Sequence, residues 1–135
     1  MEKLRLLGKI ENLERLMQFV SASAREQGFT DKKIQEIELA TEEALVNIFN
    51  YSYPEGDVGE VEVSCITDND VNFIIELLDN GIEFDLRAAS EPDLEATVTG
   101  RPIGGLGIFL IKKMVDDLKY RREGENNILT LIIHK

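Results

Sequence analysis

The sequence has 135 residues, of which 43% are apolar and 30% are charged, and its formal net charge is −11. This length suits one domain with its own core and is too short for two ordinary domains, so we expect a single domain over residues 1–135. The negative charge opposes a general attraction to nucleic acid or to an anionic membrane surface, which favours a protein or a small molecule as partner.

Cysteine usage and the N-terminal segment narrow the class of protein further. Cys65 is the only cysteine, so the sequence contains no disulfide framework and no cluster of thiolates with zinc spacing. Four charged residues interrupt the first ten, which leaves no apolar core for a signal peptide. No apolar run approaches the length of a membrane span. We therefore expect a cytoplasmic protein.

The first part of the chain predicts an edge strand and two helices. Leucines alternate with charged residues at the start, which is typical of an edge strand reaching Ile10. Apolar residues then recur at helical spacing over residues 13–24, and Gly28 is a stop signal just past this helix. A second helix begins near Thr30 or Asp31, either of which can cap it.

Two polar residues of the second helix are candidates for chemistry. Glu43 and Asn47 are four residues apart, so a carboxylate and an amide project from one helix face, about 100° round the axis from the apolar stripe. This pair suits a magnesium ion and a general base. The alternative is a solvated helix face, but Asn is a poor residue for a helix interior. The apolar stripe itself consists of Ile34, Ile37, Thr41, Ala44, Leu45 and Ile48.

Two strands are expected in the middle of the chain. A turn at residues 54–57 precedes the alternation of Val61, Val63 and Cys65, which indicates a half-buried strand. Residues 71–78 are nearly all apolar, so we expect a central strand that is covered on both faces or at least deeply placed.

The tripeptide Asp79-Asn80-Gly81 ends this apolar run. Asn-Gly is a strong signal for a β-hairpin turn, but a hairpin needs a second strand at once, and residues 84–89 do not predict one. The other interpretation is a ligand site, in which Gly81 lets the backbone come close to a flat ligand held by the Asp79 carboxylate.

A long irregular segment leads into a glycine-rich helix start. Residues 86–103 mix charged and small residues with two prolines and a glycine, and loops of this length in a compact domain are usually lids or binding loops. Residues 104–107, Gly-Gly-Leu-Gly, then open an apolar helix, whose first N–H groups are an anion site. A merely flexible helix start is the simpler alternative. A Rossmann fingerprint is disfavoured because no strand precedes the glycines.

The remaining residues predict a closing hairpin with its turn at residues 124–127. We therefore expect an α+β fold: a two-layer sandwich in which three main helices lie on one face of a largely antiparallel mixed sheet.

Three motifs in this order resemble the GHKL ATP-binding superfamily, and within it the single-domain anti-sigma-factor serine/threonine kinases. Residues 43–47 are similar to the N box, residues 79–84 to the D-x-G-x-x-F box and residues 104–107 to the G-x-G box. The resemblance spans nearly the whole chain. It implies the Bergerat ATP-binding fold, ATP and Mg²⁺ as cofactors, and an ATP lid at about residues 86–103.

The resemblance also implies roles for matching residues. Glu43 would be the general base, and the Asn47 side-chain oxygen would be a ligand of Mg²⁺. Asp79 would accept a hydrogen bond from the adenine amino group, with Gly81 close to the ring and Phe84 packed behind it. An acceptor-only carboxylate distinguishes adenine from guanine, which offers an acceptor at that position.

The phosphates would lie against the glycine-rich turn, with Arg101 of the lid near the terminal phosphates. An ordinary exposed loop arginine is the alternative for Arg101. The implied ATP-binding residues of this segment are Arg101, Gly104, Gly105, Leu106 and Gly107.

As a function, the resemblance implies phosphorylation of a serine or threonine on a STAS-type antagonist protein, which holds or releases a sigma factor and so regulates transcription. It also implies a possible homodimer and no direct contact with nucleic acid or membrane. One position differs: many of these kinases carry histidine four residues after the N-box asparagine, where this chain has Tyr51. This difference favours the alternative of a nucleotide-gated binding module without useful catalysis.

Overall fold

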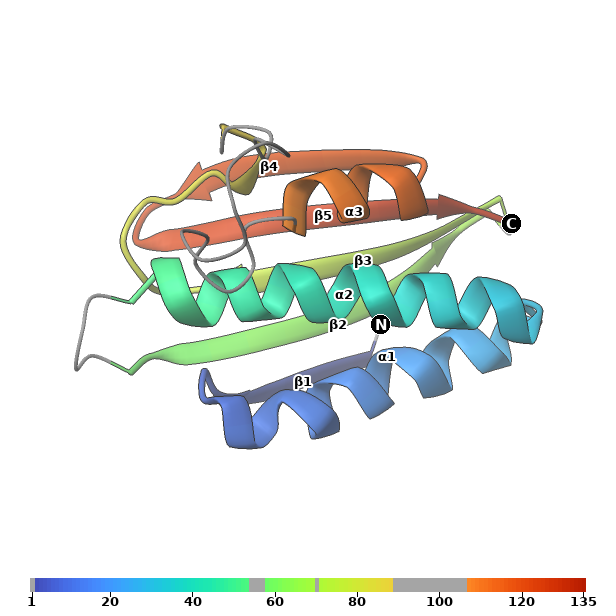
Figure 1. Ribbon diagram of the computed structural model, residues 1–135, viewed down its shortest axis with the longest axis horizontal. Coiled ribbons are helices and arrows are strands. Elements are labelled where there is room, and N and C mark those ends of the chain that lie inside the picture. The colour runs from blue at the N-terminus through green and yellow to red at the C-terminus, as the bar shows by residue number, and fades with distance from the viewer. Residues whose placement is uncertain (1, 54–57, 70, 89–106) are drawn as a thin grey trace, which may run out of the picture.

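The computed structural model describes residues 2–53, 58–69, 71–88 and 107–135, which form one sheet with helices on one of its faces (Figure 1). The five strands have the order β1-β2-β3-β5-β4, and all four neighbouring pairs are antiparallel. The predicted two-layer α+β architecture is confirmed, although the described sheet is wholly antiparallel rather than mixed.

The strands are β1 (Glu2–Leu7), β2 (Glu60–Asp68), β3 (Asn72–Asp79), β4 (Asp117–Glu123) and β5 (Asn126–His134). The helices are α1 (Leu13–Glu26), α2 (Asp31–Tyr51) and α3 (Gly107–Met114), with short 3₁₀ turns at Ile10–Asn12 and Leu86–Ala88. The predicted turn at 54–57 lies outside the described residues.

Local signals set the helix ends. Gly28 adopts a φ of +83° after α1, a left-handed conformation that glycine reaches at no steric cost. Thr30 caps α2, because its hydroxyl oxygen accepts a hydrogen bond from the backbone N–H of Lys33 at 3.1 Å. The edge strand ends before the predicted Ile10, which lies in a 3₁₀ turn with 64% of its surface exposed.

Helix α2 lies across the sheet between α1 and α3 (Figure 1). Contact on three sides explains why its buried face is wider than the predicted apolar stripe: Ala40 and Asn47 are buried together with that stripe. Within the described residues, no helix has the length and apolar character needed to span a membrane.

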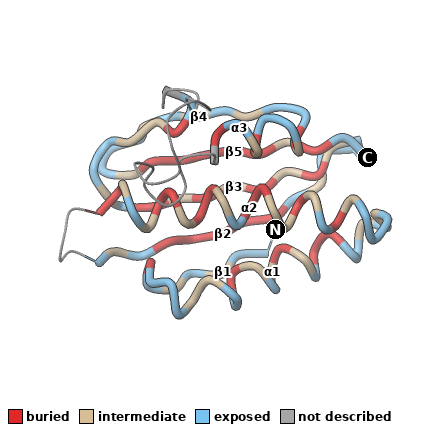
Figure 2. The backbone as a smooth tube through the Cα atoms, in the orientation of Figure 1, coloured by how far each residue is buried: buried red, intermediate tan, exposed pale blue. Residues whose placement is uncertain are grey.

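Helices of the described residues cover only one face of β3, so the prediction of cover on both faces is wrong, whereas its alternative of a deeply placed central strand is confirmed. Its burial alternates, with Phe73, Ile75, Leu77 and Asp79 buried toward the helices and the residues between them partly exposed (Figure 2). All three described α-helices lie on the same side of the sheet, so the period of two typical of a half-buried strand appears. This alternation places Asp79 in the core.

The one-sided core can be tested on neighbouring residues of β5. Leu131 is fully buried toward the helices, whereas Ile132 is partly exposed. We expect Leu131→Ala to lower the free energy of unfolding by about 2–5 kcal/mol. Ile132→Ala is expected to lower the free energy of unfolding by roughly 1 kcal/mol, because folding removes less of this side chain's apolar surface from contact with water. Urea unfolding followed by circular dichroism measures both, and equal losses would contradict a core on one face.

Candidate functional site

Three separate parts of the chain meet at one end of the sheet. They are the C-terminal end of α2, the segment after β3 and the turn between β4 and β5, all at the left of Figure 1. Hydrogen bonds join them: Ser52 at the end of α2 donates to Asp79 at 3.4 Å, and Arg122 of β4 donates to the Gly81 carbonyl at 2.9 Å. The segment that begins at Asp79 therefore lies against the end of α2, the helix that carries Glu43 and Asn47.

The Asp79 carboxylate is the buried centre of this cluster, with 1% of its surface exposed. Its Oδ1 accepts two hydrogen bonds at 2.9 Å, from the backbone N–H of Gly81 and from Nδ2 of Asn127. Among the described residues, its Oδ2 accepts only the longer bond from the Ser52 hydroxyl. Burial raises the pKa of Asp79, and its hydrogen bonds and Arg122 oppose that shift. The carboxylate thus keeps acceptor capacity on Oδ2.

The hairpin interpretation of Asp79-Asn80-Gly81 is wrong. β3 pairs with β2 and β5, and residues 82–85 after the tripeptide form no strand. The Asn80 side chain instead faces the start of β2, where its Oδ1 accepts from the Glu60 N–H and the Tyr53 hydroxyl, both at 3.1 Å. The tripeptide is therefore anchored to α2 and β2 rather than turned into a hairpin.

Gly81 is required by a close approach of two backbone segments. A Cβ at this position would lie 2.1 Å from the carbonyl oxygen of Ser52, far inside a van der Waals contact. The neighbouring Ile82 N–H donates to that same oxygen at 2.7 Å. Packing alone thus explains the glycine, and the implied contact between Gly81 and adenine stays a prediction.

Asn47 and Glu43 border the core as their spacing predicts. Asn47 is 2% exposed, so a solvated helix face is wrong for this residue. Its Nδ2 donates to the Glu43 carbonyl oxygen at 2.6 Å, and its Oδ1 accepts no hydrogen bond from the described residues. Glu43 is partly buried, and burial followed by the nearby charge of Glu42 raises its pKa. In the described part of the chain, the Glu43 carboxylate has no ion-pair partner.

A metal ion fits this donor set only in a limited way. Across the ranges that the structure describes, no group of three or more His, Cys, Asp or Glu side chains could hold one. The Asn47 Oδ1, which accepts no hydrogen bond from the described residues, is a hard oxygen ligand of the kind that suits Mg²⁺, an ion usually held through few protein groups plus phosphate oxygens and water. The residues therefore fit a magnesium ion that arrives with a phosphate ligand.

Sequence reasoning missed Asn127, which it assigned to the closing turn. Asn127 lies in β5 directly opposite Asp79, and its Nδ2 donates to the Ile82 carbonyl at 2.7 Å as well as to Asp79. Its Oδ1 accepts from the Phe84 N–H at 3.1 Å and from the Tyr120 hydroxyl at 2.6 Å. The missed signal is the period of two: residue 127 is in phase with the core leucines 129 and 131.

Most of the glycine-rich motif lies outside the residues that the structure describes. Arg101, Gly104, Gly105 and Leu106 lie outside the described residues, and Gly107 is the first residue of α3. The predicted lid begins at the 3₁₀ turn Leu86–Ala88, in which Leu86 is buried, and residues 89–103 lie outside the described residues.

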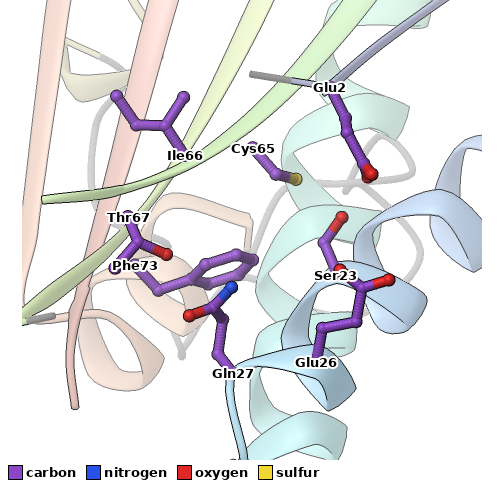
Figure 3. A pocket seen from close by; sticks show the side chains of 8 residues that line it. All are labelled: Glu2, Ser23, Glu26, Gln27, Cys65, Ile66, Thr67 and Phe73. Carbon is purple, nitrogen blue, oxygen red and sulfur yellow. The ribbon is translucent and has the colours of Figure 1, made fainter.

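A separate cavity of about 410 Å³ lies at the other end of the sheet, between the end of α1 and the start of β1 (Figure 3). Two carboxylates, from Glu2 and Glu26, line it without a Lys or Arg, which disfavours a polyphosphate ligand. Its lining residues are Glu2, Ser23, Glu26, Gln27, Cys65, Ile66, Thr67 and Phe73. Burial raises the pKa of the Cys65 thiol to about 11, so it is a structural thiol rather than a nucleophile.

Residues 7–133 match the histidine kinase-like ATPase domain. The chain belongs to this family. The predicted superfamily is thereby confirmed, since the match covers all three motifs.

Relatives within the family carry a more specific name. The serine-protein kinase RsbW of Listeria monocytogenes serotype 4a (strain HCC23) is 30% identical over 86% of this chain and 76% of its own. The serine-protein kinase RsbW of Bacillus cereus (strain Q1) is 30% identical over 98% of this chain and 85% of its own.

Solved structures share the fold. The RsbU and RsbW domains of a Mycobacterium tuberculosis protein superpose with a TM-score of 0.66 at 15% identity, covering 98% of this chain and 32% of that longer chain. A blue-light activated histidine kinase domain from Erythrobacter litoralis gives a TM-score of 0.53 at 15% identity, covering 90% of this chain and 59% of that chain.

The burial of Asp79 makes a prediction about stability without ligand. Asp79→Asn retains an acceptor for Gly81 and Asn127, and its new amide can donate to Ser52, while the cost of burying a charge disappears. We therefore expect the variant to be at least as stable as the native chain at pH 7.

The sign of the pH dependence follows from the raised pKa. The folded protein holds the Asp79 proton more tightly than the unfolded chain, so this group lowers stability as pH rises from about 4, the usual Asp pKa, through the folded pKa. The stability advantage of Asp79→Asn should therefore grow with pH across that window, as measured by urea unfolding at several pH values. A variant that is less stable throughout would show that hydrogen bonds specific to the carboxylate outweigh its desolvation.

Proposed function

We propose that this protein is a Mg²⁺-ATP-dependent serine/threonine kinase that phosphorylates a small antagonist protein and so controls a sigma factor. The observation that carries the proposal is the buried Asp79, which has acceptor capacity left on one oxygen and contacts the end of α2, the helix that carries Glu43 and Asn47. Membership of the ATPase family and 30% identity to serine-protein kinases support it.

Recognition of adenine follows from the hydrogen-bond count on Asp79. Oδ1 is saturated by Gly81 and Asn127, so Oδ2 is the oxygen that would accept from the adenine amino group. Guanine carries a carbonyl oxygen at the equivalent position, and two acceptors would then face each other without a proton between them. Phe84, whose N–H is fixed by Asn127, would pack behind the ring.

The phosphates and the metal would bind away from the adenine, at α2 and the glycine-rich motif. Asn47 Oδ1 would bind Mg²⁺, while Arg101 and the backbone of residues 104–107 would contact the phosphates. Bound Mg²⁺ supplies neutralisation of phosphate charge, a large requirement in a chain with a net charge of −11.

Glu43 would act as the general base of phosphoryl transfer. Its carboxylate accepts the proton of the substrate serine hydroxyl, whose oxygen bonds to the γ-phosphorus as the bond from that phosphorus to the β,γ-bridging oxygen breaks and ADP leaves. The raised pKa of Glu43 makes it a stronger base than an exposed glutamate, and no cation of the described residues neutralises it.

The remaining features of the proposal come from the family resemblance. They are one domain over residues 1–135 with a lid at about residues 86–103, a STAS-type antagonist and a sigma factor as partners, a possible homodimer, and a cytoplasmic location.

Calorimetric titration of ATP, ADP and GTP, with and without Mg²⁺, tests the pocket. We expect magnesium-dependent binding of ATP and ADP, with GTP at least about 100-fold weaker because the Asp79 acceptor rejects its carbonyl. Asp79→Asn should weaken ATP binding by roughly 10- to 100-fold, the worth of a hydrogen bond to a charged group. Equal affinity for GTP and ATP would contradict the assigned role of Asp79.

Glu43→Gln tests the kinase chemistry. The amide cannot accept the serine proton, so label transfer from γ-labelled ATP to an antagonist protein should fall by roughly 100- to 10,000-fold. Nucleotide affinity should change little in the same calorimetric titration, because Glu43 is not assigned to ligand binding. Transfer at the native rate would show that Glu43 is not the base.

A nucleotide-gated binding module is the second candidate, favoured by Tyr51 in place of the usual histidine. This reading predicts that ATP and ADP change the capture of a partner protein while no label is transferred to it. Transfer of label to the captured partner would decide for the kinase.

A further inference from the structure

We propose that Tyr51 is a positioning residue that couples the two parts of the nucleotide site. One part is α2 with Glu43 and Asn47, and the other is residues 79–84, called here the base segment. The inference rests on the proposed nucleotide site. It adds a residue that fixes the position of the base segment relative to α2.

Three consecutive residues at the end of α2 contact the base segment. The Ser52 carbonyl accepts the Ile82 N–H at 2.7 Å, and the Ser52 hydroxyl donates to Asp79. The Tyr53 hydroxyl donates to Asn80 at 3.1 Å. The Tyr51 ring packs on the Phe84 ring, with centroids 5.4 Å apart and planes at 37°. The end of α2 therefore contacts the base segment at its start, middle and end.

The Tyr51 contact reaches Asp79 by a second route. Phe84 donates its backbone N–H to Asn127 Oδ1 at 3.1 Å, and Asn127 donates to Asp79 Oδ1 at 2.9 Å. Asp79 is thus held from the Ser52 side through Oδ2 and from the Tyr51 side through Phe84 and Asn127. Loss of the aromatic contact would loosen Phe84 and so weaken the second route, while the hydrogen bond from Ser52 to Asp79 would remain.

Tyr51 also shares a helix face with the phosphate part of the site. It follows Asn47 by four residues, so the two side chains are neighbours on the last turn of α2. The Ser52 contact to Ile82 is made by backbone, and Tyr53 is also fixed to β2 by its 2.9 Å bond to the Glu60 carbonyl. The contact between the Tyr51 and Phe84 rings therefore joins the helix turn that carries Asn47 to the end of the base segment.

The test is a titration of Mg²⁺-ADP against Tyr51→Phe, Tyr51→Leu, Phe84→Leu and the double leucine variant. Phenylalanine keeps the stack, so Tyr51→Phe should bind within about 2-fold of the native chain. Tyr51→Leu should bind about 2- to 10-fold more weakly, the worth of an aromatic pair. The double variant should bind measurably better than the product of the two single effects predicts, because each single variant already removes the ring contact.

Phe29→Leu is the matched control. Phe29 and Phe73 form a ring pair at 5.7 Å and 62° that is far from the base segment, at the opposite end of β3. This variant should lose stability while its ADP affinity stays within about 2-fold of native. An equal loss of affinity in Phe29→Leu would show that general destabilisation, not positioning, explains Tyr51→Leu.

Amide hydrogen exchange in the nucleotide-free protein separates this inference from the proposed function. Tyr51→Leu should reduce the protection of the Phe84 amide selectively and leave that of Ile82, which binds Ser52. If the native chain binds no nucleotide, the proposed function fails, while the exchange data still decide whether Tyr51 holds Phe84. Unchanged Phe84 protection in Tyr51→Leu, or strictly additive affinity losses in the double variant, would overturn the inference.

Discussion

The burial of the Asp79 carboxylate is the constraint on which this end of the molecule depends. Because helices cover one face of the sheet, alternate residues of β3 enter the core, and Asp79 falls in phase with Phe73 and Leu77. A charge in that position costs solvation energy unless donors surround it. Gly81, Asn127 and Ser52 supply those donors from three parts of the chain, so the base segment, β5 and the end of α2 are fixed relative to one another.

The donors are unequal, and this inequality gives the site its chemistry. Two strong hydrogen bonds saturate Oδ1, while Oδ2 has one long bond within the described residues and keeps the capacity to accept another. An apolar or neutral residue would avoid the cost of burying a charge here, and the proposed recognition of adenine gives that cost a function. The same principle applies to Glu43, whose raised pKa comes from partial burial without a neutralising cation in the described ranges.

Helix α2 connects the Asp79 carboxylate to the residues proposed for phosphoryl transfer. Its central position between α1 and α3 buries Asn47 and half-buries Glu43, and its last turn grips the base segment through residues 51–53. Under the proposed function, α2 would set the distance between the two parts of a nucleotide, because it carries Glu43 and Asn47 and its last turn contacts the base segment. Tyr51, the residue that differs from the usual pattern, sits at this joint.

By itself the sequence determined the helices, their caps and the motif residues, because helical periodicity, the Thr30 cap and the Gly28 stop are local properties. It did not determine the one-sided cover of β3, since that depends on where three distant helices pack. Nor did it identify Asn127, whose role needs the β3–β5 register that sets it opposite Asp79. The close approach of Gly81 to Ser52 was likewise decided only by tertiary structure, because it joins backbone segments brought together by packing.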